Sequence, residues 1–374
     1  METRINIFGD FVAKNIDAIK IGEKLKAELS KGAYNVLNFE APIEGVGSKI
    51  TKSGPSLCQS KYSPSFVEMM GFNVVSMANN HAMDYGEEGC ESTISLFSKK
   101  VVVVGAGRLD NAYKMMVLEG LGGGVKIGFL AVTHNEFGVL GTCANKEDYG
   151  TAWLNHPIAY QAIIRAKEDV DYLIILPHAG IEYMDAPLPE IRALYKNYVD
   201  MGADAVVASH PHQIQGWELH EGKPIFYSLG NFYFDMISGK NEKWYQSLMV
   251  SLFLDSETKN VRYEVKGVSF NTLGNLDIDE TNAVVDRSYG LCSMLKSEQY
   301  LTYVDNFCRV AYPLYKYQCL RGLSGVNLMM HPKYLIRSIF NLIRRSPDEA
   351  TFLNDIRCES HRWLLERIIK LKIK

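Results

Sequence analysis

The amino-acid sequence predicts an α/β fold, and three observations support this prediction. Short apolar runs rich in β-branched residues recur along the first 235 residues, and each ends in a polar or glycine-containing turn. Segments with helical periodicity usually follow these runs. A later pair of strand-like runs is joined by a short polar loop. Alternating strands and helices are typical of α/β proteins, and the residues taken alone favour one doubly wound sheet.

The predicted strands are short and almost wholly apolar, which is typical of strands buried on both faces of a sheet. They are Ile5–Phe8, Tyr34–Leu37, Asn73–Met77, Val101–Val104, Lys126–Val132, Tyr172–Leu176, Asp204–Ala208 and Pro224–Tyr227. The helices predicted between them include Ile16–Leu29, Ser65–Met70, Ala159–Glu168 and Leu188–Met201.

The segment 247–270 has a different pattern. Ser247–Leu254 and Val261–Phe270 are two strand-like runs, and the polar residues 256–260 between them are typical of a hairpin loop. We therefore expect an antiparallel pair of strands in addition to the alternating strands and helices.

Helical patterns dominate after about residue 275, so we predict a first domain at 1–275 and a C-terminal helical region at 276–374. The predicted helices there are Ser297–Leu314, Pro332–Arg345 and Glu349–Ile369. Residues 281–374 carry 15 basic and 8 acidic side chains, a balance of +7, whereas the first 280 residues carry a balance of −10. The basic amphipathic stretches Tyr334–Arg345 and Trp363–Lys372 indicate either contact with a membrane surface or a partner protein, or a helical cap on the first domain.

Composition limits the class of protein. Of the 374 residues, 47% are hydrophobic and 22% charged, as in ordinary soluble globular proteins. Seven scattered cysteines without a C-x-x-C pattern argue against a disulfide framework and a cysteine zinc site. No signal-peptide pattern and no apolar stretch of about 18 residues occur, so we expect a cytoplasmic protein, with the basic helices as a route to the membrane periphery. The acidic first domain makes a nucleic-acid partner unexpected.

The most informative residues follow the predicted strands. Polar side chains stand at six strand ends: Asp10, Glu40, Asn80 with His81, His178, His210 with His212, and Asn231. Sites of α/β proteins form where loops converge at the carboxyl ends of parallel strands. Oxygen and imidazole donors without a thiolate suit divalent ions such as Mn, Fe or Zn. The set therefore predicts a divalent-metal site.

Each of these residues also has a simpler interpretation when taken singly. An aspartate after a strand is often a helix cap or turn residue, and a lone histidine in a core strand is usually structural. The pair His210 and His212 is more informative, because two imidazoles around a rigid proline can serve two metals at once. His134 follows a predicted strand and could line the same site. We interpret the remaining histidines as structural or surface residues: His156, His220, His331 and His361.

The strand ends carry ordered motifs that together identify a family. They are Phe8-Gly9-Asp10, Asn38-Phe39-Glu40-Ala41-Pro42-Ile43, Ala78-Asn79-Asn80-His81-Ala82-Met83-Asp84-Tyr85-Gly86, His178-Ala179-Gly180-Ile181-Glu182-Tyr183, Ser209-His210-Pro211-His212 and Tyr227-Ser228-Leu229-Gly230-Asn231-Phe232. In this order, over residues 5–270, they resemble the CapA-type capsule (poly-γ-glutamate) biosynthesis family, which is similar to the calcineurin-like metallophosphoesterases.

The resemblance implies a four-layer α-β-β-α sandwich, with two mixed sheets face to face, and a C-terminal helical extension. It implies two divalent ions: Asp10 and His212 would bind the first, Asn80, His178 and His210 the second, and Glu40 would bridge them. Asp10, Glu40 and His81 would be catalytic, with His81 as general acid. The groups implied to support the ligands or contact substrate are Asn38, Asn79, Asp84, Glu182 and Asn231.

The chain also departs from the family pattern. Val12 stands where the phosphoesterase signature has a histidine, the bridging position holds Glu40 instead of aspartate, and Ala179 replaces a tryptophan. The first metal therefore has fewer obvious protein ligands than the signature supplies.

The function implied is a metal-dependent hydrolase of phosphoesterase type in capsule or surface-polymer biosynthesis, with a metal-bound hydroxide as nucleophile. Its partners would be a surface polymer or phosphorylated substrate and capsule synthase components. Two alternatives remain open: a non-catalytic metal-binding scaffold of a polymer synthase, for which Val12 is the main argument, and a small-molecule phosphodiesterase.

Overall fold

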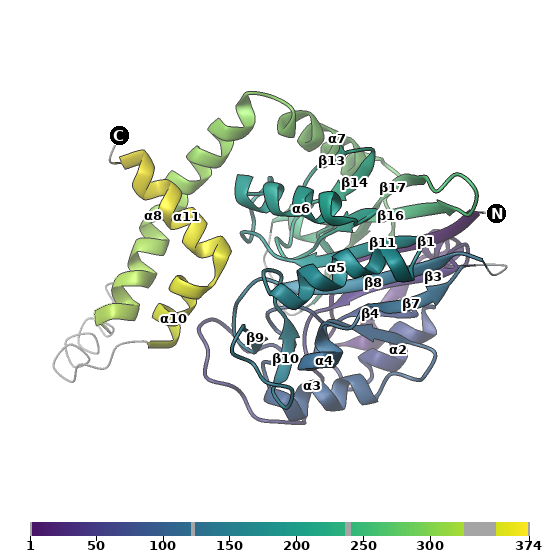
Figure 1. Cartoon of the computed structure of the whole chain (residues 1–374), viewed down its shortest axis with the longest axis horizontal. Helices are drawn as coiled ribbons and strands as arrows, with labels where there is room; N and C mark the ends of the chain where they lie inside the picture. Colours follow the sequence, from purple (N-terminus) through teal and green to yellow (C-terminus); the bar gives the residue numbers. More distant parts are fainter. Residues whose placement is uncertain (1, 121–123, 236–240, 325–348, 373–374) are drawn as a thin grey trace.

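The computed structural model describes residues 2–120, 124–235, 241–324 and 349–372. Two large β-sheets pack face to face, and helices cover their outer faces, as Figure 1 shows. This arrangement confirms the four-layer sandwich implied by the family resemblance. The single doubly wound sheet favoured by the residues alone is wrong, because the same parallel strands are divided between two sheets.

The first sheet has nine strands, and its central strand is β1. Its members are β1 (Glu2–Val12), β2 (Lys20–Ile21), β3 (Tyr34–Phe39), β4 (Val74–Ser76), β5 (Val102–Val104), β15 (Asn231–Phe234), β16 (Gln246–Asp255), β17 (Val261–Phe270) and β18 (Asn275–Ile278). The order is β2-β18-β17-β16-β1-β3-β4-β5, and β15 also pairs with β1. Strands β1, β3, β4 and β5 run parallel, whereas β16 and β17 form the predicted antiparallel pair.

The second sheet has six strands in the order β13-β14-β12-β11-β8-β7. They are β7 (Met116–Glu119), β8 (Lys126–Thr133), β11 (Tyr172–His178), β12 (Ala205–Val207), β13 (Trp217–His220) and β14 (Lys223–Phe226). The four inner strands run parallel, and β7 and β13 run antiparallel at the edges. A small third sheet joins β6 (Ala106–Arg108), β10 (Tyr149–Ala152) and β9 (Val139–Leu140).

Apolar side chains fill the space between the two large sheets. Ile5 and Val36 from the first sheet belong to the same buried cluster as Phe129 and Ile174 from the second. Two further clusters lie outside. Helices α1 (Glu23–Leu29), α2 (Ser63–Met69) and α3 (Gly86–Ser95) cover the first sheet, and α5 (Pro157–Asp169) and α6 (Pro189–Met201) cover the second. Because both faces of each sheet are covered, inner strands such as β8 and β11 are buried along almost their whole length and largely apolar.

The predicted helix Ile16–Leu29 is wrong in its first half. Only α1, from Glu23, is α-helical, whereas residues 16–21 form a short 3-10 turn (Ile16–Ala18) and β2. Ile21 pairs with Leu276 of β18. This contact spans most of the chain, so the local sequence pattern could not indicate it.

The C-terminal helices are α7 (Ala283–Leu295), α8 (Gln299–Ser324), α10 (Glu349–Arg357) and α11 (Glu359–Lys372). The predicted helix Glu349–Ile369 is thus two helices that meet at Cys358. The boundary predicted near 275 falls inside the first sheet, because β18 pairs with β17. No helix among the described residues is long and apolar enough to span a membrane.

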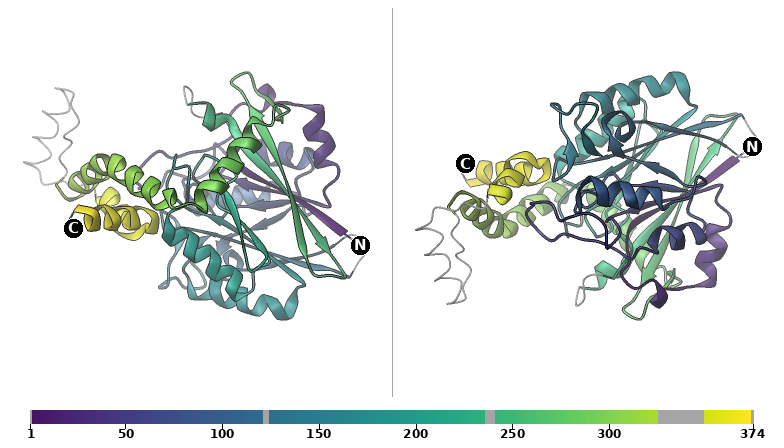
Figure 2. Two further views of the ribbon diagram at one scale, coloured as in Figure 1. Left: turned by 90° about the horizontal axis from the view of Figure 1, so that it is seen from above. Right: turned by 90° about the horizontal axis from the view of Figure 1, so that it is seen from below.

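Helices α8, α10 and α11 lie at the end of the sheets opposite the N-terminus, as all views in Figures 1 and 2 show. Leu364 and Ile368 of α11 are fully buried in the same cluster as Tyr195 of α6. The apolar face of the basic stretch Trp363–Lys372 is therefore buried in a core that also contains Val304 and Cys308 of α8, and Arg367 reaches Glu190 of α6 at 3.9 Å. The other basic stretch, Tyr334–Arg345, lies outside the described residues, as does His331.

Candidate metal centre

Carboxyl ends of strands from both large sheets converge on one buried basin. The first sheet contributes Asp10 of β1, Glu40 directly after β3, and Asn80 in the turn after β4. The second sheet contributes His178 at the end of β11, and His210 and His212 in the turn after β12. All six side chains are at most 5% exposed. The sequence therefore placed the six predicted ligands correctly at one site, although their roles as metal ligands stay predictions.

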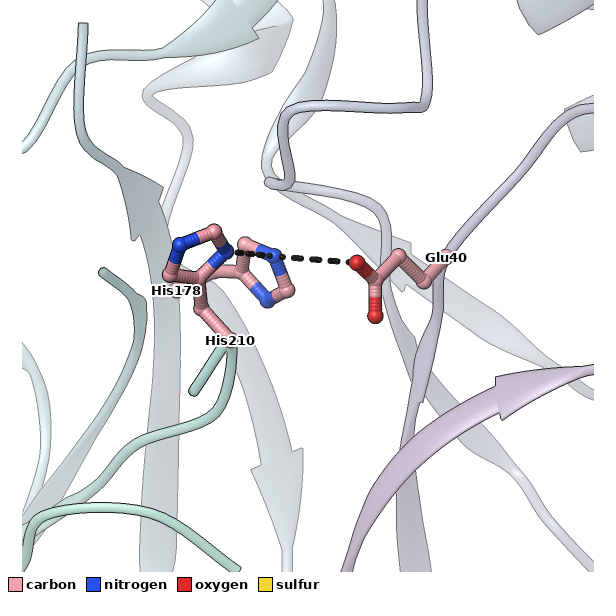
Figure 3. A group of neighbouring side chains, drawn as sticks. All are labelled: Glu40, His178 and His210. Carbon is pink, nitrogen blue, oxygen red and sulfur yellow. Dashed lines mark hydrogen bonds and ion pairs between the residues drawn. The ribbon is translucent and has the colours of Figure 1, made fainter. Parts of the chain in front are cut away.

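Glu40 lies at the centre of this basin. Figure 3 shows its carboxylate directed from one side towards the imidazoles of His178 and His210 on the other. Its Oε1 atom lies 3.5 Å from Nε2 of His178 and 3.7 Å from Nε2 of His212. Neither carboxylate oxygen accepts a hydrogen bond, although the residue is fully buried. A buried carboxylate without such partners is unfavourable unless a cation or a proton joins it.

Glu40 is shared by two sets of possible metal ligands. Asp10, Glu40 and His212 form one set, and Glu40, His178 and His210 form the other. Within each set, one donor atom per residue lies within 4.8 Å of the others. This division is the one implied by the family resemblance, with Glu40 between two positions for cations.

Asn80 extends the second set. Its Oδ1 lies 3.0 Å from Nε2 of His178, and its Nδ2 donates a hydrogen bond of 3.1 Å to Glu136. Because Glu136 takes the amide nitrogen, the amide oxygen is left to face the histidines. Oxygen is the atom of an asparagine that can bind a metal.

Electrostatics within the first set favour a cation. Burial, with the neighbouring charge of Asp10 second, raises the pKa of Glu40 well above its usual value. Burial opposes a charge on His212, but Glu40 and Asp10 together raise its pKa to about 10. The acidic pair Asp10 and Glu40 thus favours a positive charge at the position of His212. A metal ion would supply that charge in place of a proton, since metal ligands bind in their deprotonated form.

The second set contains imidazoles that are neutral near pH 7. Burial lowers the pKa of His178 to about 4 despite the opposing charge of Asp10. Burial, reinforced by the charge of His134, also lowers the pKa of His210 well below its usual value. Neutral imidazoles carry the free lone pair that a metal requires.

The turn between β12 and the next strand has an unusual backbone. His210 has φ 106° and His212 has φ 55°, in the region that non-glycine residues rarely adopt. The two conformations direct both imidazoles back into the basin, where His210 packs against His178 with ring centroids 4.9 Å apart. Strained backbone of this kind is concentrated at functional sites.

His81 lies beside the basin and is absent from both ligand sets. Its Nδ1 lies 2.6 Å from Asp84 Oδ2, while Lys52 Nζ lies 2.5 Å from the other carboxylate oxygen of Asp84. Burial, and next the charge of Lys52, lower the pKa of His81. Because Nδ1 is held by Asp84, the other ring nitrogen is the one available to a substrate.

The remaining predicted residues lie around the ligands. Asn38 donates to Asp10 Oδ1 at 2.7 Å, and Asn231 Oδ1 lies 2.9 Å from Nδ1 of His212. Asn79 donates to Asn38 Oδ1 at 3.2 Å. Glu182 differs from these buried groups, because it is exposed and lines the neighbouring cavity.

A cavity of about 520 Å³ opens beside the second ligand set. Its wall includes Asn80, His81 and His210 from the basin, and Phe307, Tyr315 and His361 from the C-terminal helices. His361 was predicted to be structural or at the surface; it is half-buried, and its ring lies 5.2 Å from that of Tyr315 in the cavity wall. The helix that carries it folds over the basin, and local sequence does not indicate such long-range packing. By contrast, His156 caps α5 by accepting from the Ile158 amide, and His220 pairs with Asp200.

Three residues near the basin were not identified from the sequence: Lys52, Glu136 and Cys358. Each lies outside the strand-end motifs, and only its position in space brings it to the site. Glu136 follows His134, the isolated histidine after β8, by two residues. Its position two residues after that histidine was the one sequence feature that could have indicated a role at the site.

Comparison with known sequences shows the family. Residues 7–236 match the family described as bacterial capsule synthesis protein PGA_cap. The chain belongs to this family. The PGA_cap match covers every predicted ligand, and it ends two residues after β15.

Two curated relatives are capsule proteins. The capsule biosynthesis protein CapA of Bacillus anthracis is 37% identical over 215 residues, which are 55% of this chain and 52% of that protein. The PGA biosynthesis protein CapA of Bacillus subtilis (strain 168) is 36% identical over 205 residues, 54% of this chain and 53% of that protein. The chain thus matches these relatives over about half of their length.

Solved structures show a more distant likeness. A candidate 5′-nucleotidase from Staphylococcus aureus, in complex with alpha-ketoglutarate, aligns with 79% of this chain and 58% of its own at 14% identity and a TM-score of 0.46. The sulfate thiohydrolase SoxB of Thermus thermophilus aligns with 80% of this chain and 60% of its own at 9% identity and a TM-score of 0.44. The fold described above rests on the strand order of this chain itself.

Proposed function

We propose that this member of the PGA_cap family is a metal-dependent hydrolase of phosphoesterase type that serves capsule or surface-polymer biosynthesis. The observation that supports the proposal most directly is Glu40, a buried carboxylate without hydrogen bonds that is shared by two sets of metal ligands. The substrate class would be a poly-γ-glutamate type polymer or a phosphorylated precursor, and capsule synthase components would be partners.

The residues present fit a pair of divalent ions. Asp10, Glu40 and His212 would hold one ion, and Glu40 with Asn80, His178 and His210 would hold the other. The donors are oxygens and imidazoles, which suit Mn, Fe or Zn. The absence of hydrogen bonds to the Glu40 carboxylate and the raised pKa of His212 are both explained if cations belong there.

Bound divalent ions would supply Lewis acidity, which lowers the pKa of water and screens negative charge on a substrate. The protein's own contribution is to fix the ligands and to handle a proton. Asn38 holds the Asp10 carboxylate, and Asn231 holds the ring of His212. These contacts set the orientation of the ligands before any ion arrives.

His81 is suited to transfer a proton to a leaving group. It lines the cavity, and its Nδ1 is fixed by Asp84, which in turn is held by Lys52 and by the Leu57 amide. Such a chain fixes the ring orientation, as the carboxylate does in a catalytic triad. The free ring nitrogen would then act on a substrate in the cavity.

A second candidate function is a non-catalytic scaffold of a polymer synthase. Val12 favours it, because the side chain that replaces the signature histidine is fully buried in the outer apolar cluster of the first sheet. It cannot contribute a ligand, so the first set has three donors where the signature would supply four.

Metal analysis and a hydrolysis screen separate the two functions. We would purify the full chain, measure bound metals by mass spectrometry, and assay p-nitrophenyl phosphate and bis(p-nitrophenyl) phosphate with added Mn²⁺. The hydrolase proposal expects at least two ions per chain and chelator-sensitive hydrolysis of at least one compound. A folded, metal-loaded protein that hydrolyses neither these compounds nor a polyglutamate chain would favour the scaffold.

A further inference from the structure

A third group of ligand-type side chains lies next to the basin and belongs to neither set described above. His134 and Glu136 come from the turn after β8, and Cys358 lies where α10 meets α11. All three are buried, and one donor atom of each lies within 4.8 Å of the others. The group is thus assembled from the first domain and from the C-terminal helices.

The spacing of these side chains matches that of ligands around one ion. His134 Nε2 lies 3.6 Å from Glu136 Oε1, Cys358 Sγ lies 3.7 Å from the same oxygen, and His134 Nδ1 lies 3.8 Å from Cys358 Sγ. Zinc binds sulfur at about 2.3 Å and nitrogen or oxygen at about 2.0–2.2 Å in tetrahedral sites, which places its ligands roughly 3.5 Å apart. The three side chains are therefore spaced like the ligands of one ion, and a turn of the His134 ring would direct a single nitrogen at it.

His134 leaves a donor atom unused in this group. The ring is 0% exposed, and its Nε2 has no hydrogen-bond partner. Its Nδ1 lies 3.3 Å from the Ser360 hydroxyl. In the tautomer whose Nδ1 donates to the Ser360 hydroxyl, Nε2 has a lone pair that faces the Glu136 carboxylate; in the other tautomer, Nε2 carries a proton directed at that carboxylate. A cation between Nε2 and Glu136 would select the first tautomer, because two acceptors that face each other in a buried space repel without one.

We propose that His134, Glu136 and Cys358 bind a further divalent cation, and that its donor set selects zinc. A thiolate, an imidazole and a carboxylate are the three kinds of protein ligand that zinc accepts together. On binding, the thiol proton of Cys358 leaves to solvent and the thiolate takes the metal. The two sets around Glu40 contain no sulfur, so the third site differs from them in chemistry.

The third site is connected to the predicted second metal position through one amide. Glu136 uses Oε1 towards the group and accepts the Asn80 amide through Oε2 at 3.1 Å. The next residue after the cysteine, Glu359, accepts hydrogen bonds from the Asn135 amide and the Asn155 side chain, at 2.8 and 3.0 Å. A cation here would tie the C-terminal helices to the turn that orients Asn80.

Cobalt substitution tests this site separately from the other two. The metal-free full chain is titrated with Co²⁺, and the near-ultraviolet band that arises from thiolate-to-cobalt charge transfer is recorded. Imidazole and carboxylate ligands do not produce this band. We expect the wild type to show it and Cys358→Ser to lose it while binding one ion fewer per chain. Cys308→Ser, which changes another buried cysteine of the C-terminal helices, should retain it.

Two further variants keep the thiol and remove another ligand. Glu136→Gln and His134→Gln should weaken Co²⁺ binding at this band at least tenfold, and they provide the test if Cys358→Ser does not fold by circular dichroism. Zinc should displace the band in the wild type. A folded wild type without the band at saturating Co²⁺, or a band that persists in Cys358→Ser, overturns the proposal. Either result leaves the proposed hydrolase function untouched, because the sets around Glu40 contain no thiolate.

Discussion

Glu40 is the residue on which the proposed metal pair depends. The Glu40→Gln substitution keeps its shape but removes the charge, so we expect affinity for both ions to fall by more than about 100-fold, above the loss that supporting residues produce. The metal-free protein should be as stable as the wild type or more so, because a buried carboxylate that accepts no hydrogen bond has been removed. Mass spectrometry of bound metal and thermal unfolding with and without chelator measure the two effects.

Glu218 provides the matched control for that substitution. Its carboxylate is paired with Arg192 at 2.5 and 2.6 Å and belongs to none of the ligand sets. Glu218→Gln should therefore lower stability by about 1–3 kcal/mol and leave metal content unchanged. Equal metal content in Glu40→Gln and the wild type would contradict the ligand assignment.

His81 is predicted to transfer a proton without binding metal. His81→Ala should retain both ions and lose turnover by roughly 10²–10⁴-fold, the usual contribution of a general acid. Turnover of bis(p-nitrophenyl) phosphate and metal content are measured on the same preparation. His220→Ala, at a half-buried histidine paired with Asp200, serves as the control and should change neither. Loss of metal together with activity would show instead that His81 is a ligand.

At the scale of single elements, α1 is held to the first sheet by one carboxylate. Glu28 is 7% exposed at its side chain and contacts Arg4, Lys31 and Lys266, each at 2.6 Å. Burial would raise its pKa, but these cations, Lys266 foremost, lower it from 4.5 to about 2. The lowered pKa means that its stabilising contribution is present above pH 4.5 and is lost as pH falls towards 2.

We therefore expect Glu28→Gln to lower the free energy of unfolding by about 1–3 kcal/mol at pH 7. The difference from the wild type should shrink between pH 4.5 and pH 2, which urea unfolding across this range would measure. Glu23→Gln in the same helix is the control. Its side chain is 87% exposed in its pair with Lys26, so its effect should stay within about 0.5 kcal/mol. A pH-independent difference for Glu28→Gln would refute the explanation.

The sequence predicted elements well where the pattern was local. Strands such as Tyr34–Leu37 and Tyr172–Leu176 are buried on both faces, and their apolar runs indicated this directly. The sequence pattern failed where long-range contacts determine an element. Strand β2 exists because Ile21 pairs with Leu276, and β1 continues to Val12 because β15 pairs along it. The ligands were found because they follow apolar strands and match the family motifs, whereas Glu136 follows β8 outside any motif and Cys358 follows no strand.

At the scale of the whole molecule, the C-terminal helices share a core with the first domain. Ile368 is fully buried in that core, whereas Ile369 is 52% exposed. Ile368→Ala should cost about 2–5 kcal/mol in the docking of α11, and Ile369→Ala should stay within about 0.5 kcal/mol. Hydrogen exchange of α11 amides measures the difference. Equal protection in the two variants would mean that α11 does not depend on this contact.

The division of strands between two sheets was beyond the residue pattern. Parallel strands such as β3 and β11 have the same apolar character, and nothing local assigns them to different sheets. The family resemblance supplied the sandwich, and the apolar cluster between the sheets confirms it.

The basin draws Asp10, Glu40 and Asn80 from one sheet and three histidines from the other. Ions bound there would cross-link the two large sheets. Ligands that bind only the folded state add stability in proportion to the logarithm of their free concentration. Resistance to heat and proteases should therefore rise with the free metal concentration around the protein. Removal of metal should weaken the packing between the two sheets at this basin.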